Sequence, residues 1–489
     1  MSEKFTLWNM QQEFLELLQE SSQSLMSSLD SRLNPEVFLV AIKSDSDGLS
    51  AKIIAPDKCV FQNFEFDNLN EVSKSFSKSP LQRVAMKNDE FASFLSPIRR
   101  AIVQILNTSK INDGKLEFYI SLPAEVNDYD VCVVMGLQKN VLDSYPRLPK
   151  ESKSETDKVF LLQNIFQAVT HRFFYRCQQE LSVQEHGALG WAFNFTDSDL
   201  LREAASDFIN DITYRIDSSL SDGTDLFETC CKISHLSYEK SEPLGKLILA
   251  EEDVAFIERS LEFAPPAEVS NLRIARKLLE LTHNGLFLHS DSEKIYSLCK
   301  FKRHKSKDDN CFVIEFLGLH KWQIKHKGEI LICVNYGTPS LPKLSFDATS
   351  YRRDLANIFK IRSPRKLNKL LEIIEIASVE SKGALIVISD NAKSEAKRLG
   401  GQSISLKPTY LMPELTKSIT PIDGAILIDP SGICYAIGSI LDGLASDGGN
   451  SGRGARYNSS IRYIEYQKSL KVHCAAIVIS EDGELDLIK

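Results

Sequence analysis

A chain of 489 residues is too long for one ordinary hydrophobic core, and at about 100–200 residues per domain it is expected to contain two to four. Its 43% hydrophobic and 25% charged residues are typical of a globular protein in water. The formal net charge of -8 argues against general binding to nucleic acid or to an anionic membrane, because such binding requires clustered Lys and Arg.

The chain also lacks the signals of export. Its first residues contain no apolar core of the length a signal peptide needs, and no run of about 18 apolar residues occurs. Ten cysteines are scattered without a CxxC pair, which favours free thiols over a zinc site or a disulfide framework. We therefore expect a cytoplasmic protein without membrane contact.

The first 157 residues alternate helical and strand patterns. Helices are predicted over residues 11–33 and 96–106, the second with Ser96 as its cap and Pro97 at its first position. Strands are predicted over residues 37–42, 116–123 and 131–137. The polar, proline-containing stretch 143–157 then marks a boundary, so residues 1–157 are predicted to form an N-terminal α/β domain.

Residues 158–350 are predicted to form a sensor-like domain of helices and an antiparallel sheet. Helices are expected over 158–181, 197–220 and 271–282, with Asp197 or Ser198 capping the second. Two prolines in the segment 263–270 are expected to break the pattern. Strands are expected over 285–290, 294–300, 311–319 and 328–337, with the basic segment 301–310 as a solvated hairpin tip rather than a ligand contact.

Pro339 and Pro342 mark a second boundary, and a connecting helix is predicted over 351–360. From residue 363 onward strands and helices alternate, which predicts an α/β sheet covered on both faces. The expected helices are 367–379, 394–399, 411–417 and 455–466. The expected strands are 383–388, 424–429, 433–441 and 475–480, followed by a closing hairpin.

A glycine-rich loop precedes the last of these helices. Glycines at 448, 449, 452 and 454 let the backbone N–H groups turn toward a ligand, and a helix starting near Ala455 adds its free N–H groups. Arg453 and Arg456 supply positive charge for phosphate. An anion site and a plain surface turn both remain open, and no GKS or GKT follows as in a Walker loop.

Two acidic residues stand at the ends of predicted strands in the same segment. Asp423 precedes a glycine at a strand start, and Glu481 follows the strand that ends at Ser480. Carboxylates so placed beside a phosphate loop can hold a divalent cation near a sugar or phosphate. The alternative is that each is only a solvated turn residue.

The C-terminal segment 363–489 resembles the catalytic domain of diadenylate cyclases. The resemblance rests on four ordered pieces: SKGALIVISD, PIDGAILID with the DGA motif, GRGARYNSSIRY, and AAIVISEDGELDLI. It implies a central mixed β-sheet flanked by helices, with the preceding α+β domains as a sensor region.

The resemblance also implies a mechanism and a set of site residues. Two ATP molecules would react between face-to-face domains of a homo-oligomer, giving cyclic di-AMP and two pyrophosphates. Asp423, Arg456 and Glu481 would be catalytic, and Asp423 and Glu481 would hold Mg²⁺ or Mn²⁺. The further nucleotide-binding residues would be Gly424, Ala425, Leu441, Asp442, Gly443, Arg453, Gly454, Ala455, Tyr457, Asn458, Ser459 and Ser480.

The sequence departs from the family in one place. Arg456 matches the first residue of the family's Arg-His-Arg triplet, but Tyr457 and Asn458 follow it, so one cation and one imidazole are missing from the phosphate site. Three hypotheses therefore stay open: an active diadenylate cyclase, a nucleotide-binding regulator without turnover, and a cyclase with another product. The sequence does not reveal which ligand or protein the N-terminal region senses.

Overall fold

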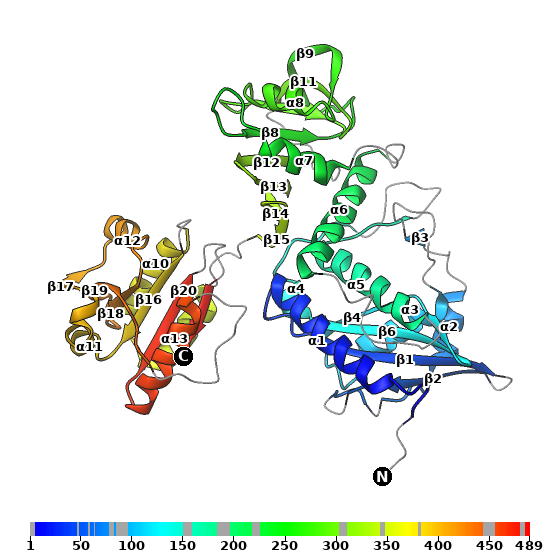
Figure 1. The fold of residues 1–489 in the computed structure, drawn as a ribbon, viewed down its shortest axis with the longest axis horizontal. Coiled ribbons are helices and arrows are strands. Elements are labelled where there is room, and N and C mark those ends of the chain that lie inside the picture. Colours follow the sequence, from blue (N-terminus) through cyan, green and yellow to red (C-terminus); the bar gives the residue numbers. More distant parts are fainter. Residues whose placement is uncertain are drawn as a thin grey trace. The chain divides into compact units, whose positions relative to one another are not determined.

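The computed structural model divides into two compact units, Met1–Pro342 and Lys343–Lys489 (Figure 1). The division falls at Pro342, one of the two prolines expected to mark a boundary. The predicted domain limits at residues 157, 350 and 363 stay predictions. The structure describes residues 5–45, 48–56, 59–62, 64–77, 83–84, 96–149, 159–182, 196–217, 225–302, 311–342, 348–379, 383–443, 455–479 and 485–489.

The first unit begins with a five-stranded sheet in the order β2-β1-β6-β4, with β5 also paired to β6. The central strand β1 is buried at every position from Val37 to Ile42, which requires cover on both faces. Phe38 and Val40 share a core with α2 and α3, while α1 and α5 contact β1 and β6 (Figure 1). These elements are α1 (Gln11–Leu29), β1 (Glu36–Asp45), β2 (Gly48–Ile54), α2 (Leu69–Ser77), β3 (Arg83–Val84), α3 (Pro97–Thr108), β4 (Leu116–Ile120), β5 (Ala124–Val126), β6 (Tyr129–Gln138), α4 (Lys139–Leu142), β7 (Val159–Phe160) and α5 (Ile165–Leu181).

The same unit contains a second, eight-stranded sheet in the order β15-β14-β13-β12-β8-β10-β11-β9. Its neighbouring strands are antiparallel except β8 and β10, which are parallel. Its elements and the helices around them are α6 (Asp197–Ile216), α7 (Leu226–His235), β8 (Leu244–Leu249), β9 (Ile257–Glu268), α8 (Leu272–Leu279), β10 (Phe287–Ser290), β11 (Lys294–Phe301), β12 (Phe312–Gly318), β13 (Lys321–His326), β14 (Glu329–Asn335) and β15 (Thr338–Ser340).

Several expectations for the first unit were wrong. The two prolines were expected to break the pattern, but β9 runs through them. They lie in a bulge of this edge strand, between the pairs Glu262–Ser297 and Ala267–Ile295. Segment 301–310 does not connect a hairpin, since β11 pairs with β9 and β10 whereas β12 pairs with β8 and β13. Residues 303–310 lie outside the described part. The helix expected from residue 158 begins only at Ile165, capped by Asn164.

The second unit is built on a six-stranded mixed sheet in the order β17-β19-β18-β16-β20-β21. Strands β16 and β18 are parallel, and the other neighbours are antiparallel. Every residue of β16, β18 and β20 is buried, because helices cover both faces. Ile386 and Ile388 pack in one core with α9, α10 and α12, whereas Leu385 and Val387 pack in the other with α11 and α13.

The bounds in this unit are α9 (Ala348–Phe359), α10 (Pro364–Val379), β16 (Ala384–Ser389), α11 (Ala392–Arg398), η3 (Gly400–Gln402), β17 (Ile404–Tyr410), α12 (Pro413–Ile419), β18 (Ala425–Ile428), β19 (Ile433–Ser439), α13 (Ala455–Ser469), β20 (Cys474–Ile479) and β21 (Leu485–Ile488). The predicted mixed sheet flanked by helices is confirmed. None of the described helices combines the length and apolar character of a membrane span.

Candidate functional site

Asp423 lies at the N-terminal end of β18, two residues before the strand begins at Ala425. Its carboxylate Oδ1 accepts a hydrogen bond from the N–H of Gly424 at 3.0 Å. The side chain is 95% exposed, so a ligand can reach it. The fold therefore presents this carboxylate to solvent at the end of an otherwise buried strand.

Arg456 lies in the first turn of α13, and its guanidinium forms an ion pair with the Asp423 carboxylate at the end of β18. The Arg456 Nη2 is 3.2 Å from the Asp423 Oδ1, although the two residues are 33 positions apart in the chain. The Arg456 side chain is only 31% exposed, and the Oγ of Ser459 donates to its carbonyl oxygen at 3.0 Å. The fold thus brings the two principal predicted residues to one place.

The backbone at Asp423 is fixed by a close contact between two glycines. Gly424 has a φ of +95°, and a Cβ built on it would lie 2.6 Å from the carbonyl carbon of Gly438 in β19. No side chain fits there without moving the strand, and the positive φ also favours glycine. This contact explains why the residue after the aspartate is glycine.

Apart from Asp442 and Gly443, the remaining predicted residues divide into three groups. Ala425 is fully buried and Leu441 is half-buried against the α13 side of the core, so neither presents an open side chain. Ala455, Tyr457 and Asn458 lie with Arg456 in the first turns of α13. Four predicted residues are outside the described part of the chain: Arg453, Gly454, Ser480 and Glu481.

Asp442 and Gly443, also predicted to bind nucleotide, contact other residues of the second unit. The Asp442 carboxylate forms a two-pronged ion pair with Arg398, with N–O distances of 2.5 and 2.7 Å, and these hydrogen bonds lower the pKa of Asp442. Gly443 packs on α13, where a Cβ would lie 2.8 Å from the carbonyl carbon of Arg462. These two residues therefore attach the segment after β19 to α11 and α13.

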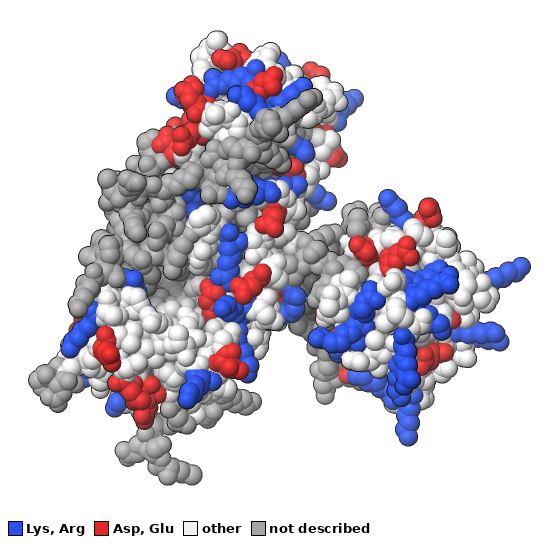
Figure 2. Space-filling model, turned by 180° about the vertical axis from the view of Figure 1, so that it is seen from behind, with Lys and Arg blue, Asp and Glu red and all other residues white. Residues whose placement is uncertain are grey.

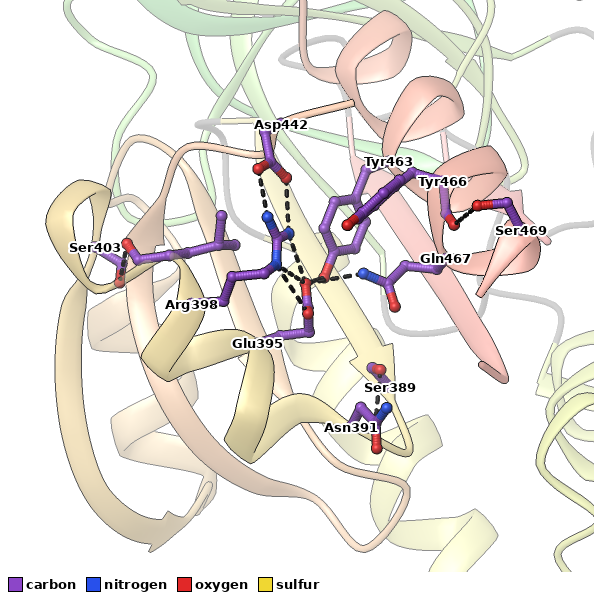
Figure 3. Close-up of polar contacts among 11 residues, drawn as sticks. Ser389, Asn391, Glu395, Arg398, Ser403, Asp442, Tyr463, Tyr466, Gln467 and Ser469 are labelled. Carbon is purple, nitrogen blue, oxygen red and sulfur yellow. Dashed lines mark hydrogen bonds and ion pairs between the residues drawn. The ribbon is translucent and has the colours of Figure 1, made fainter. Parts of the chain in front are cut away.

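Sequence reasoning missed the polar network that contains Arg398 (Figure 3). Glu395 of α11 is 7% exposed, and its Oε2 accepts hydrogen bonds from the Tyr463 hydroxyl and the Gln467 Nε2 of α13, both at 2.8 Å. Arg398 donates to the same carboxylate at 2.8–3.2 Å. The only signal in the sequence was the spacing, i,i+3 for Glu395 and Arg398 and i,i+4 for Tyr463 and Gln467.

Asp423 is suited to a divalent cation. Both of its hydrogen bonds fall on Oδ1, and the carboxylate is otherwise exposed. Mg²⁺ is commonly bound by one or two carboxylates together with substrate phosphates. Within the described ranges, no group of three or more His, Cys, Asp or Glu side chains could hold a metal alone, so a cation here would need oxygen atoms from the nucleotide.

The second unit is less acidic than the chain as a whole. Residues 343–489 contain 20 Lys and Arg against 17 Asp and Glu, a formal charge of +3, whereas the complete chain has -8. Seen from behind, the surface of this unit is rich in Lys and Arg (Figure 2). A phosphorylated ligand would therefore be repelled less by this unit than the charge of the whole chain suggests.

Comparison with known families decides what this unit is. Residues 372–489 match the model described as DisA bacterial checkpoint controller nucleotide-binding. Residues 372–489 of the second unit are a DisA-type nucleotide-binding domain. Two further models match upstream of the DisA-type domain: probable sensor domain DACNG at residues 7–209 and probable sensor domain DACNH at residues 224–328. The resemblance to diadenylate cyclases is thereby confirmed at the level of the family.

Solved structures similar to the chain include two bacterial proteins. A cysteine double mutant of DacA from Staphylococcus aureus shares 19% identity, with 26% of this chain and 83% of that chain covered and a TM-score of 0.22. A hypothetical membrane spanning protein from Bacillus cereus shares 24% identity, with 30% and 72% covered and a TM-score of 0.21. No curated protein matches the chain.

Proposed function

We propose that this protein is a diadenylate cyclase, which condenses two ATP molecules into cyclic di-AMP and two pyrophosphates. The observation that carries the proposal is the pairing of Asp423 and Arg456 at 3.2 Å, at the mouth of β18 in a DisA-type domain. An exposed carboxylate beside a guanidinium can receive a ribose hydroxyl and an adjacent phosphate at the same time.

In the proposed reaction the 3′-hydroxyl of each ATP attacks the α-phosphate of the other. Asp423 lies beside the 3′-hydroxyl and favours its loss of a proton, and Arg456 opposes the negative charge that grows on the attacked phosphate. Mg²⁺ or Mn²⁺, held by Asp423 and by the predicted ligand Glu481, would stabilise the alkoxide and the leaving pyrophosphate. Two such steps close the ring and release two pyrophosphates.

Each domain would bind one ATP, so the reaction requires two domains with their sites facing each other. Bringing the two nucleotides together in this way supplies the orientation that the reaction needs. We therefore propose that the active form is a homo-oligomer.

A direct test incubates the full-length protein with ATP and either cation and identifies the products by mass spectrometry. We expect cyclic di-AMP from wild type and at least about a hundredfold less from Asp423→Asn, because the variant loses the charge beside the hydroxyl. Glu375→Gln, an exposed carboxylate on α10, is the matched control and should keep full activity. No cyclic product with either cation, or an undiminished yield from Asp423→Asn, would reject the proposal.

A second function is favoured by Tyr457 and Asn458, which give the phosphate site fewer charges than the Arg-His-Arg triplet. The protein would then bind ATP or cyclic di-AMP and act as a regulator. Calorimetry separates the two: binding without turnover at all cation and protein concentrations selects the regulator. Competition between ATP and GTP in the same assay tests a cyclase with another base preference.

We further propose that the two sensor-type domains control the rate by controlling how the catalytic domains pair. The second unit has its own core and sheet, so residues 348–489 can be compared with the full chain. Identical rates and identical assembly in both would contradict this role.

A further inference from the structure

The network around Glu395 connects α11 to the helix that carries Arg456. Glu395 is a buried carboxylate, and a buried charge is tolerated only when its oxygens are paired and hydrogen-bonded. Here the pairing comes from Arg398 on its own helix and from the Tyr463 hydroxyl and Gln467 amide of α13 (Figure 3). Burial raises the pKa of the Tyr463 phenol, so it stays a hydrogen-bond donor.

Arg398 extends the connection to a third segment. Its Nη1 and Nη2 contact the two oxygens of Asp442 at 2.5 and 2.7 Å, and its guanidinium lies 5.4 Å from the centre of the Tyr466 ring. A planar, bidentate ion pair of this kind fixes the relative orientation of the two side chains as well as their distance. One guanidinium therefore joins α11, α13 and the chain that leaves β19.

Arg456 lies on the same helix as the residues of α13 that take part in this network. Arg456 and Tyr463 are seven residues apart on α13, about 10 Å along the helix axis. The ion pair between Arg456 and Asp423 is exposed on the Asp423 side and contributes too little to hold a helix in place. The buried hydrogen bonds of Glu395 and the contact of Gly443 with the Arg462 backbone are stronger constraints on α13.

We propose that Arg398 is a positioning residue for the cyclase reaction: through Glu395 and Asp442 it holds α13 so that Arg456 meets the reacting phosphate beside Asp423. The proposal rests on the proposed function and adds to it a residue that does not touch the substrate.

The main test compares Arg398→Ala and Arg398→Lys with Lys397→Ala, an exposed neighbour on the same helix. Misplacing a reacting group by about 1 Å can reduce a rate a hundredfold, so we expect Arg398→Ala to lower kcat by about 10- to 100-fold. The KM for ATP should change less than about threefold, because Arg456 acts mainly on charge that grows in the transition state. Arg398→Lys keeps the charge without the two-pronged geometry and should recover part of kcat. Lys397→Ala should behave as wild type.

Asp442→Asn is a second variant for the case that Arg398→Ala fails to fold. It breaks the ion pair of Arg398 with Asp442 but leaves Glu395 with all its hydrogen-bond donors. It should lower kcat in the same direction, and its effect should not add to that of Arg398→Ala, because both break one ion pair. A wild-type kcat in Arg398→Ala, a loss confined to KM, or a loss that follows the folded fraction would overturn the proposal.

Hydrogen exchange gives a readout that does not depend on turnover. Amides of residues 455–463 should exchange faster in Arg398→Ala than in wild type or Lys397→Ala, because α13 loses its anchor. If wild type makes no cyclic dinucleotide, the proposed function fails, yet this comparison still decides the anchoring. Unchanged exchange in Arg398→Ala would refute the anchoring by itself.

Discussion

At the scale of single residues, the position of Asp423 depends on the absence of a side chain next to it. Gly424 combines a φ of +95° with a Cβ position only 2.6 Å from the Gly438 backbone. An alanine there would have to adopt a left-handed conformation and push β19 away from β18. The position of the Asp423 carboxylate and the pairing of β18 with β19 therefore depend on the same contact between glycines.

We predict that Gly424→Ala lowers the free energy of unfolding by about 2–4 kcal/mol, from the positive φ and the overlap with the backbone together. It should also reduce cyclase activity, because Asp423 moves with its neighbour. Gly401→Ala is the matched control: a Cβ there meets nothing within 4 Å and no positive φ opposes it. Urea unfolding followed by circular dichroism measures the free energy of unfolding of both variants. Equal stability of the two would contradict the steric account.

Residues of the candidate site could be predicted from the sequence only where they lie in a recognisable motif. Asp423 and Arg456 were identifiable because each lies in a motif, and the fold places them 3.2 Å apart. The resemblance predicts that Asp442 binds nucleotide, and that stays a prediction; its ion pair with Arg398 could not be read from the sequence. Glu395 could not be identified, because an acidic and a basic residue at i,i+3 on a helix also describe a solvated surface pair. Its burial exists only after α13 has packed over it.

At the scale of elements, apolar periodicity located most helices and buried strands of the second unit. It missed β17, whose residues are almost all exposed and which contains a proline, because an edge strand with two solvated faces has no hydrophobic pattern. The sequence also predicted a helix from residue 158, whereas Leu162 binds a side chain of α6 and the helix starts after Asn164. Contacts distant in sequence decide such boundaries.

The contact between Leu162 and Asp211 of α6 predicts how the stability of the protein depends on pH. Asp211 of α6 accepts a hydrogen bond from the N–H of Leu162 at 2.6 Å, and burial raises the pKa of its carboxyl to about 7, with Asp207 adding to the rise and Arg215 opposing it. Because this pKa lies above that of an unfolded Asp, about 3.9, the folded state holds a proton that the unfolded state has lost. Stability contributed by this group is therefore lost as pH rises from about 4 to about 7.

Asp211→Asn cannot titrate, so its stability relative to wild type should increase across this pH window and level off above it. One pKa unit corresponds to about 1.4 kcal/mol, which gives an expected change on the order of 2–4 kcal/mol. Calorimetric melting of both proteins at a series of pH values measures the difference, with exposed Asp128→Asn as control. A difference that is constant with pH would show that Asp211 titrates as an ordinary surface carboxyl.

At the scale of the whole molecule, one chain has one Asp423–Arg456 pair, whereas the proposed product needs two phosphodiester bonds. In the proposed pair of domains, each Asp423 would serve the 3′-hydroxyl of its own ATP, and the attacked phosphate would belong to the partner's ATP. This arrangement predicts that a pair of two wild-type chains and a pair of one wild-type and one variant chain make different products.

We therefore predict that mixing wild type with Asp423→Asn produces a linear dinucleotide. In a mixed pair only one hydroxyl is activated, so one phosphodiester bond forms, one pyrophosphate leaves, and the second hydroxyl stays unreacted. The linear product carries the remaining triphosphate and differs in mass from the cyclic one. Wild type mixed with Glu375→Gln should give cyclic product alone, and Asp423→Asn alone should give neither. If the mixture gives only cyclic product in proportion to the wild-type fraction, each chain completes both bonds by itself, and the face-to-face arrangement is wrong.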